Sequence, residues 1–212
     1  MNEKVLIKRK AEVELKIESL AYGGMGIAKK ENFVIFVKNA IPGQTVIARI
    51  YKKKKGYAEA RALKILVESP NVVKPKCNHF YICSKIQNLS YKEQLKEKSN
   101  QVIDAFQRLG GFKDFKLNNV VKGNPIFNYR NKMEFTFSPH RWVLDSEPEG
   151  VSKSFALGLH IPGRYDKILD INNCYIQPEI GNKILKVSRE VCLSNPKLKP
   201  YDPKTHIGFL RY

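Results

Sequence analysis

Short apolar runs alternate with charged residues through positions 11–66, and glycine and proline interrupt them repeatedly. An apolar side chain at every second position places one face of a strand in a core, so the pattern predicts several short strands. Turns are predicted at residues 23–26 and 41–43. Five such strands predict a small closed barrel of the oligonucleotide-binding type, because closure leaves no exposed strand edge. The alternating positions are Val13, Leu15, Ile17, Val46, Ala48, Ile50, Ala58, Ala60 and Ala62.

A domain boundary is predicted at Ser69 and Pro70, because the residue before a proline disfavours helix and no periodicity crosses this point. Residues 1–70 then form the barrel and residues 71–212 a small α+β domain, so the fold class is mainly β with an α+β part. The second domain is predicted to contain a helix from Ser90 to the glycine pair at 110–111, with Glu93 completing a capping box. The apolar stripe of this helix comprises Leu95, Val102, Ile103, Phe106 and Leu109.

Two further alternating segments predict a β-hairpin with a long polar loop at residues 139–154. A second helix is predicted to start at Pro178. The last six residues resemble the opening of another strand, so we expect that the chain is cut short. The apolar hairpin positions are Met133, Phe135, Phe137, Phe155, Leu157, Leu159 and Ile161, and the helix positions expected to face inward are Ile180, Ile184, Val187 and Val191.

Charge is the compositional feature that most restricts function. The chain of 212 residues holds 38 Lys and Arg against 20 Asp and Glu, a net charge of +18, which predicts a polyanionic partner such as nucleic acid. No apolar stretch approaches the roughly 18 residues of a membrane span, and the start lacks the apolar core of a signal peptide. We therefore expect a cytoplasmic monomer that binds no membrane.

Four segments occur in order in the first domain: LAYGGMGIA at 20–28, VIFV at 34–37, AIPGQ at 40–44 and YAEA at 57–60. Together they resemble a TRAM domain, a small RNA-binding barrel. Cys77, Cys83 and YKEQLKEK at 91–98 follow, then YRNKMEF at 129–135, GLH at 158–160 and CYIQ at 174–177. This order is similar to that of the RNA (uracil-5-)-methyltransferase family, and the resemblance covers nearly the whole chain.

The resemblance implies an enzyme that methylates C5 of uracil in 23S rRNA or tRNA, with S-adenosylmethionine as methyl donor. In this family a cysteine thiolate adds to C6 of the base, and both the thiolate and the cofactor site belong to a C-terminal Rossmann-like domain. This chain has no glycine-rich cofactor fingerprint, and Gly23, Gly24 and Gly26 are interpreted as a tight strand connection. We expect the RNA-binding portion of the enzyme, inactive alone. A free-standing RNA-binding adaptor is the alternative.

Two basic segments are candidates for contact with RNA. The lysine run at 52–55 lies beside a tyrosine, and ammonium groups neutralise phosphates while a tyrosine ring stacks on an unpaired base. The segment 129–132 is predicted to begin a strand, where an arginine either binds a phosphate or stacks on a base and a lysine adds charge. The residues predicted to bind RNA are Lys52, Lys53, Lys54, Lys55, Tyr57, Arg130 and Lys132, with His160 and Arg164 as weaker candidates.

The cysteines are expected to be ligands or buried thiols, since disulfides are rare in the cytoplasm. The family resemblance implies a four-cysteine iron–sulfur cluster, for which Cys77, Cys83 and Cys174 match three positions. Ile86 stands where the remaining ligand is expected, and isoleucine has no donor atom. Three possibilities stay open: a cluster with one open iron, a zinc site completed by His79, or no metal.

Overall fold

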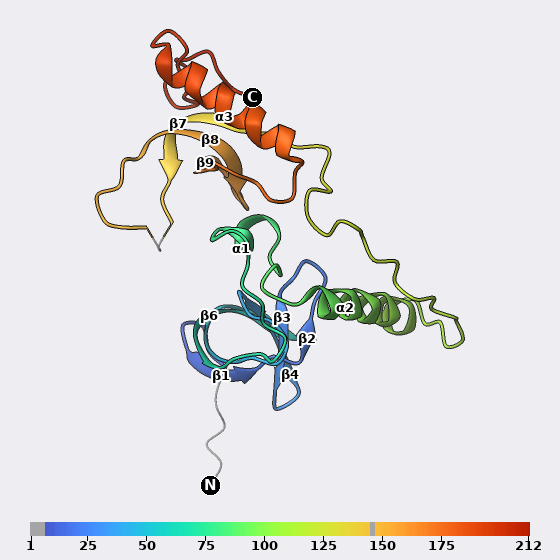
Figure 1. The fold of residues 1–212 in the computed structure, drawn as a ribbon. Coiled ribbons are helices and arrows are strands. Elements are labelled where there is room, and N and C mark those ends of the chain that lie inside the picture. The colour runs from blue at the N-terminus through green and yellow to red at the C-terminus, as the bar shows by residue number, and fades with distance from the viewer. Residues whose placement is uncertain (1–6, 145–146) are drawn as a thin grey trace. The chain divides into compact units, whose positions relative to one another are not determined.

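The computed structural model describes residues 7–144 and 147–212. The chain divides into two compact units, Met1–Lys122 and Gly123–Tyr212, and Figure 1 labels most of the helices and strands of both. Among the described residues, none of the helices is both long enough and apolar enough to cross a membrane.

The first unit is built on a six-stranded sheet that curls around its own core (Figure 1). The strand order is β1-β5-β6-β4-β3-β2, and neighbours are antiparallel except for the parallel pair β4 and β6. β1 also approaches β3, although no hydrogen-bonded ladder joins them in the described residues. The predicted mainly β character is confirmed, with six strands because a two-residue β2 precedes β3. The strands are β1 (Glu12–Lys16), β2 (Ser19–Leu20), β3 (Gly26–Lys30), β4 (Phe33–Lys38), β5 (Thr45–Lys53) and β6 (Tyr57–Val67).

The alternation seen in the sequence orients the central strands, because every second side chain enters the core. Ile35 and Val37 of β4 are fully buried, as are Ala58 and Ala60 of β6. The two strands pair in register, with Ile35 opposite Ala58 and Val37 opposite Ala60. The small alanines of β6 thus lie opposite large branched residues of β4, an arrangement that lets interior side chains interdigitate.

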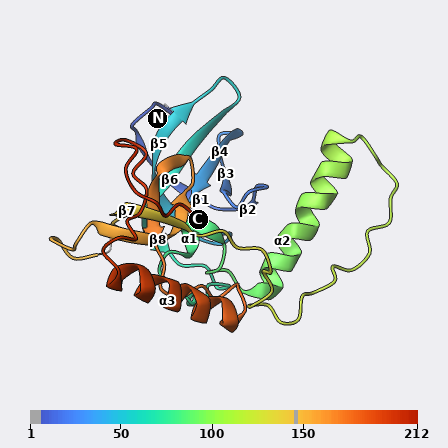
Figure 2. The ribbon, with the colours of Figure 1, turned by 90° about the horizontal axis from the view of Figure 1, so that it is seen from above.

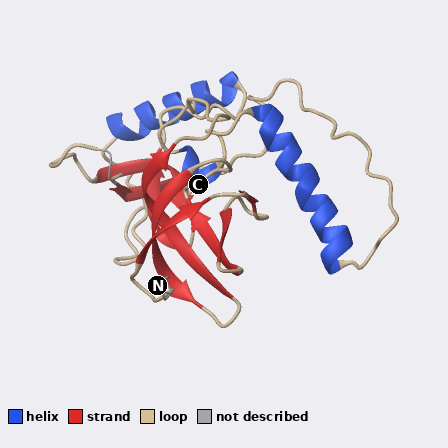
Figure 3. Ribbon diagram, turned by 90° about the horizontal axis from the view of Figure 1, so that it is seen from below, coloured by secondary structure: helices blue, strands red, loops and turns tan. Residues whose placement is uncertain are grey.

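Three helical segments follow β6, and the longest, α2, is drawn blue with the other helices in Figure 3. They are α1 (Phe80–Cys83), α2 (Tyr91–Asp104) and a π-helical turn, η1 (Ala105–Leu109). The predicted helix is therefore present, but of its apolar stripe only Leu95 and Ile103 are half-buried. Val102, Phe106 and Leu109 are 41%, 45% and 76% exposed, whereas the buried residue of α2 is Glu97. Glu97 Oε2 accepts a hydrogen bond from the backbone N–H of Leu20 at 2.7 Å, so a polar contact fastens the helix to β2.

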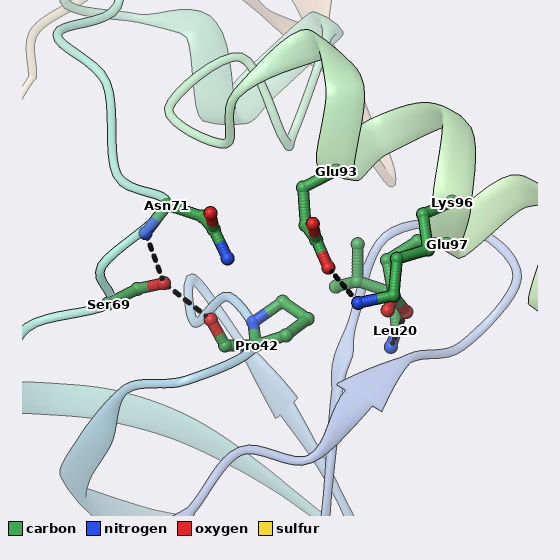
Figure 4. A network of polar contacts seen from close by, with 7 residues as sticks. All are labelled: Leu20, Pro42, Ser69, Asn71, Glu93, Lys96 and Glu97. Atoms are coloured by element: carbon green, nitrogen blue, oxygen red, sulfur yellow. Dashed lines mark hydrogen bonds and ion pairs between the residues drawn. The ribbon is translucent and has the colours of Figure 1, made fainter.

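The start of α2 differs from the predicted capping box. Ser90 is the N-cap residue, but no side-chain hydrogen bond caps the helix. Glu93 pairs instead with Lys96, Oε1 to Nζ 2.6 Å (Figure 4). The carboxylate that a capping box needs is thus engaged by a lysine three residues further along the helix surface.

The segment after β6 is bonded to the sheet and so belongs to the first compact unit. Ser69 is buried; its Oγ donates to the carbonyl of Pro42 at 2.7 Å and accepts from the N–H of Asn71 at 3.2 Å (Figure 4). Together with the contact from α2 to β2, these bonds hold residues 69–104 on the sheet. The compact unit therefore extends to residue 122, whereas the boundary predicted after residue 70 marks the end of the strands.

The second unit has three mutually paired strands and one long helix, labelled α3 in Figure 2. β7 pairs antiparallel with β8 and parallel with β9, and β8 pairs antiparallel with β9. The predicted hairpin is present, but β7 starts only at Thr136 and extends into the predicted loop, and β9 lies outside the sequence prediction. A Cβ atom on Gly158 would collide with the carbonyl oxygen of Leu169, so only glycine fits there. The elements are β7 (Thr136–Trp142), β8 (Ser154–Ile161), β9 (Arg164–Asp170) and α3 (Glu179–Ser194).

α3 begins after Pro178 as predicted, but the face predicted to be buried is wrong. The four residues expected to face inward are more than half exposed: Ile180 64%, Ile184 61%, Val187 57% and Val191 52%. The helix buries Asn182 and Leu185 instead. Asn182 Oδ1 accepts from the N–H of Cys174 at 2.9 Å, and its Nδ2 donates to the carbonyl of the same residue at 3.2 Å. This two-way contact sets the rotation of the helix and turns the branched apolar residues outward.

The last six residues do not form the predicted strand. Pro200 and Leu210 make an isolated parallel bridge. The backbone N–H of Phe137 in β7 donates to the carbonyl of Arg211 at 2.9 Å. The bridge joins two parts of the C-terminal segment, and the bond from Phe137 attaches that segment to β7 without adding a strand to the sheet.

Candidate nucleic-acid interface

The outward sides of β4, β5 and β6 gather aromatic and basic side chains. Ala58 and Ala60 of β6 point into the core, and Ile35 and Val37 of β4 do the same, so the residues between them lie outside. Two residues near the end of β5, which pairs with β6, complete this surface. This surface, the basic–aromatic face, comprises Phe36, Lys38, Tyr51, Lys52, Tyr57, Glu59 and Arg61.

The aromatic rings of this face are held in place by their neighbours. The rings of Phe36 and Tyr57 meet edge to face, with centroids 5.7 Å apart. Lys52 Nζ lies 5.9 Å from the ring centroid of Tyr57, and Lys38 Nζ lies 4.9 Å from that of Tyr51. Ammonium groups beside phenol rings suit a single-stranded nucleic acid, because the cations meet phosphates while the rings stack on bases.

Glu59 is the acidic residue of the basic–aromatic face. Its Oε1 pairs with Lys52 Nζ at 2.5 Å, and its Oε2 accepts from the Tyr51 hydroxyl at 2.9 Å. The hydrogen bond from Lys52 lowers the pKa of Glu59 and, in return, raises the pKa of Lys52. Burial and the bond to Glu59 raise the pKa of Tyr51. At neutral pH the carboxylate is therefore ionised and occupies one of the predicted RNA-binding lysines.

The other lysines of the run lie at the turn between β5 and β6. Lys53, Lys54 and Lys55 are exposed, and none of them forms an ion pair within residues 7–144 and 147–212. A hydrogen bond from the N–H of Lys54 to the carbonyl of Tyr57, 2.8 Å long, closes the turn. The predicted basic run thus consists of one paired lysine and three that are available to phosphates.

The second predicted RNA-binding segment has a different structure from the one expected. Residues 129–132 precede β7 and belong to no strand. The backbone N–H of Arg130 donates to the carbonyl of Ile176 at 2.8 Å, and its Nε donates to the carbonyl of Lys132 at 3.1 Å. Lys132 Nζ lies 3.2 Å from a carboxylate oxygen of Glu134. Both basic side chains are exposed, and their contact with RNA stays a prediction.

The two weaker candidates lie on neighbouring strands of the second unit and are exposed. His160 Nε2 is 3.2 Å from the hydroxyl of Thr136, and Arg164 is the first residue of β9. His160 also lines a pocket of about 170 Å³, where the guanidinium of Arg211 lies 3.8 Å from the ring centroid of Tyr201. The role of both candidates in RNA binding stays a prediction.

The predicted metal ligands are divided between the units: Cys77 and Cys83 belong to the first and Cys174 to the second. Over the described ranges, no three His, Cys, Asp or Glu side chains are grouped as metal ligands would be. Burial lowers the pKa of His79, so its imidazole is neutral at pH 7. Ile86 packs against a buried apolar cluster of the first unit. Because an apolar side chain fills the position of the expected fourth ligand, these residues do not fit a four-cysteine iron–sulfur cluster.

Sequence reasoning overlooked Phe36, Lys38, Tyr51 and Arg61. The alternation that identifies the buried residues of β4 and β6 also identifies the outward ones, so that signal was present. The ion pair between Lys52 and Glu59 left no such signal in the sequence. It depends on the register of β5 and β6, which shifts at a bulge near residues 50–52.

Comparison with known proteins supports a functional assignment of this fold. A model of the TRAM domain matches residues 8–63. An uncharacterized RNA methyltransferase of Chlorobaculum tepidum is 40% identical over 176 residues, which cover 80% of this chain and 36% of the relative. Another from Porphyromonas gingivalis is 34% identical over 206 residues, with 93% and 44% covered. The fold resembles that of Pyrococcus abyssi tRNA (uracil-54, C5)-methyltransferase, with a TM-score of 0.61 over 94% of this chain and 41% of that one, at 24% identity.

The curled sheet with its basic–aromatic face is thus a TRAM domain. The whole chain belongs to the RNA methyltransferase family of the relatives described above. It spans less than half the length of these curated relatives.

Proposed function

We propose that this chain is the RNA-binding portion of an S-adenosylmethionine-dependent RNA (uracil-5-)-methyltransferase that forms 5-methyluridine in tRNA or 23S rRNA. The observation that carries the proposal is the basic–aromatic face on a TRAM domain. The kinship with RNA methyltransferases supports it, as does the name of the Pyrococcus abyssi neighbour. We further propose that the protein acts in the cytoplasm as a monomer.

In this proposal, RNA lies across β4, β5 and β6. Lys53, Lys54 and Lys55 neutralise phosphates at the turn, while the exposed part of the Tyr57 ring stacks on an unpaired base and Arg61 adds a further charge. Such contacts hold a strand without reading base edges, so binding by this surface tolerates many sequences. Recognition of the target uridine is then left to other parts of the enzyme.

Methyl transfer is proposed to need residues beyond the described ones. When bound, S-adenosylmethionine supplies the methyl group. The loop of Gly23 and Gly24 leads into β3, a strand, and not into a helix whose N-terminus holds a cofactor. This loop therefore does not have the form of a glycine-rich cofactor loop, and the proposed part of the described residues is to bind and orient RNA.

The test uses the purified 212-residue chain. Fluorescence anisotropy with labelled tRNA and with 23S rRNA fragments, measured at several salt concentrations, should show binding whose logarithm falls linearly with the logarithm of salt. An assay with radiolabelled S-adenosylmethionine should show no incorporation into either RNA. Absence of RNA binding would contradict the proposed role, and methyl transfer by this chain would contradict the placement of the chemistry.

A further inference from the structure

Tyr22 is 94% exposed, the largest exposure among the apolar and aromatic side chains of the described residues. It lies in the tight loop between β2 and β3. The N–H of Ala21 donates to the carbonyl of Met25 at 2.8 Å, and the N–H of Gly24 donates to the carbonyl of Ala21 at 3.0 Å. Gly23 and Gly24 have φ angles of +89° and +83°, which allow the chain to turn this tightly. The loop therefore presents the tyrosine at its tip.

Helix α2 holds the base of this loop. Gln101 Nε2 donates to the carbonyls of Leu20 and Ala21, at 3.2 and 3.3 Å. One helical turn earlier, the buried carboxylate of Glu97 accepts from the N–H of Leu20 at 2.7 Å. Three side-chain bonds thus fix the backbone just before Tyr22. An aromatic ring on a fixed backbone loses little conformational freedom when it binds a ligand.

A lysine flanks the loop on its other side. A Cβ atom placed on Gly24 would lie 3.2 Å from Cβ of Lys85 and 3.5 Å from Cγ2 of Ile86, so the loop packs closely on this segment. Lys85 is exposed, and within the described ranges it forms no ion pair. The segment that carries Lys85 therefore packs against the loop that carries Tyr22.

We infer that Tyr22 and Lys85 form a second RNA contact, in which the tyrosine ring stacks on an unpaired base and the ammonium group neutralises the adjacent phosphate. The inference rests on the proposed RNA-binding function and adds a site to it. Gly26 starts β3 opposite Val37, whereas Tyr57 pairs with Val34 near the other end of β4. The two contacts are separated by most of the length of β3, about 13 Å for its five residues.

The inference is tested with a fluorescent single-stranded RNA and, in parallel, with the same RNA carrying 2-aminopurine, whose emission is quenched when it stacks. Tyr22→Ala should weaken binding roughly tenfold, abolish part of the quenching and leave the salt dependence unchanged, because a stacked base carries no counterion. Tyr22→Phe should retain the affinity within about twofold, since stacking does not need the hydroxyl. Lys85→Ala should lower the salt slope by about 0.7.

Two further variants test whether a loss of RNA binding arises at this site or from a general change in the protein. Gln101→Ala should weaken binding in the wild-type background and have no effect in the Tyr22→Ala background, because its role is to position the loop. Tyr165→Ala removes a tyrosine of the second unit that is 84% exposed and should leave binding unchanged. Substitutions at Tyr22 and at Lys53 should have additive effects, because the sites are far apart.

The outcomes distinguish the inference from the proposed function. If the wild-type chain binds RNA and Tyr22→Ala changes neither the affinity nor the quenching, the second contact alone is overturned. No RNA binding by the wild-type chain would overturn both. A loss for Tyr22→Ala that Tyr22→Phe shares would also overturn the stacking role.

Discussion

Arg189 of α3 and Asp170 of β9 form an ion pair, Nη1 to Oδ1 2.7 Å, in which both side chains are 14% exposed. Nη2 of the same arginine donates to the carbonyls of Leu157 and Ile171, at 3.1 and 2.9 Å. Asp170 Oδ1 also accepts from the N–H of Leu157 at 2.9 Å. One guanidinium therefore ties the helix to β8 and to the end of β9.

Arg189→Met should lower the free energy of unfolding by roughly 2–3 kcal/mol, because it removes the cation that pairs with Asp170 and the donor to two carbonyls in a mostly buried place. Urea unfolding followed by circular dichroism measures the change. The matched control is Lys186→Met on the same helix, whose contact with Glu190 is 3.9 Å long and exposed; it should cost less than about 0.5 kcal/mol. Equal effects of the two variants would contradict the role of Arg189.

Replacing Lys53, Lys54 and Lys55 together by alanine should weaken RNA binding and reduce the salt slope by about 2, since each phosphate contact contributes about 0.7 on a single strand. Lys52→Ala alone should change the slope less, because Lys52 is already paired with Glu59. Anisotropy titrations at a series of salt concentrations measure both. If the triple variant kept the wild-type slope, these lysines would merely face solvent.

Glu59→Gln should tighten RNA binding. The change removes a negative charge from the basic–aromatic face and releases Lys52, while the amide still offers an oxygen to the Tyr51 hydroxyl. Glu190→Gln alters the net charge equally on the exposed face of α3 and should have little effect. Affinity measured at fixed salt separates them, and an unchanged or weaker affinity for Glu59→Gln would refute the prediction.

The pKa of Glu59 also predicts a pH dependence of stability. Because this pKa is lowered in the folded chain, its ion pair stabilises the fold at pH values above the ordinary 4.5, and the stabilisation is lost as the pH falls through the folded pKa. The difference in Tm between wild type and Glu59→Gln should therefore be constant above about pH 5 and shrink below it. A difference that persists unchanged into acid would show that the carboxylate charge contributes nothing.

Anaerobically purified chain should contain far less iron and sulfide than a [4Fe–4S] cluster requires, because Ile86 supplies no ligand atom. Ile86→Cys should permit reconstitution with iron and sulfide, at a packing cost of about 1 kcal/mol for the smaller side chain. Cys77→Ser in the wild-type background serves as the control and should change only packing. Metal analysis that finds about four irons per wild-type chain would refute this prediction.

The strands of the first unit were predictable because alternating apolar and charged residues fit a strand that has one buried face and one exposed face. Val13 and Leu15 alternate with glutamates and are buried in β1, as expected. The exposure of the lysine run was predictable for the same local reason, since charged side chains at a turn lie in solvent. The partner of Lys52 was not, because Glu59 meets it only through the pairing of β5 with β6.

The sequence by itself determined most strands of the first unit, the presence of a helix after Ser90 and the start of α3, and it placed a run of lysines beside a tyrosine at one turn. Only the tertiary structure decided which side of each helix is buried. Glu97 of α2 turns to the N–H of Leu20, and Asn182 of α3 turns to the backbone of Cys174, while branched apolar residues of α3 remain in water. The physical reason is that a buried backbone group without a partner costs free energy that no helical periodicity records, so hydrogen bonds to backbone groups outside each helix set the rotation of both helices.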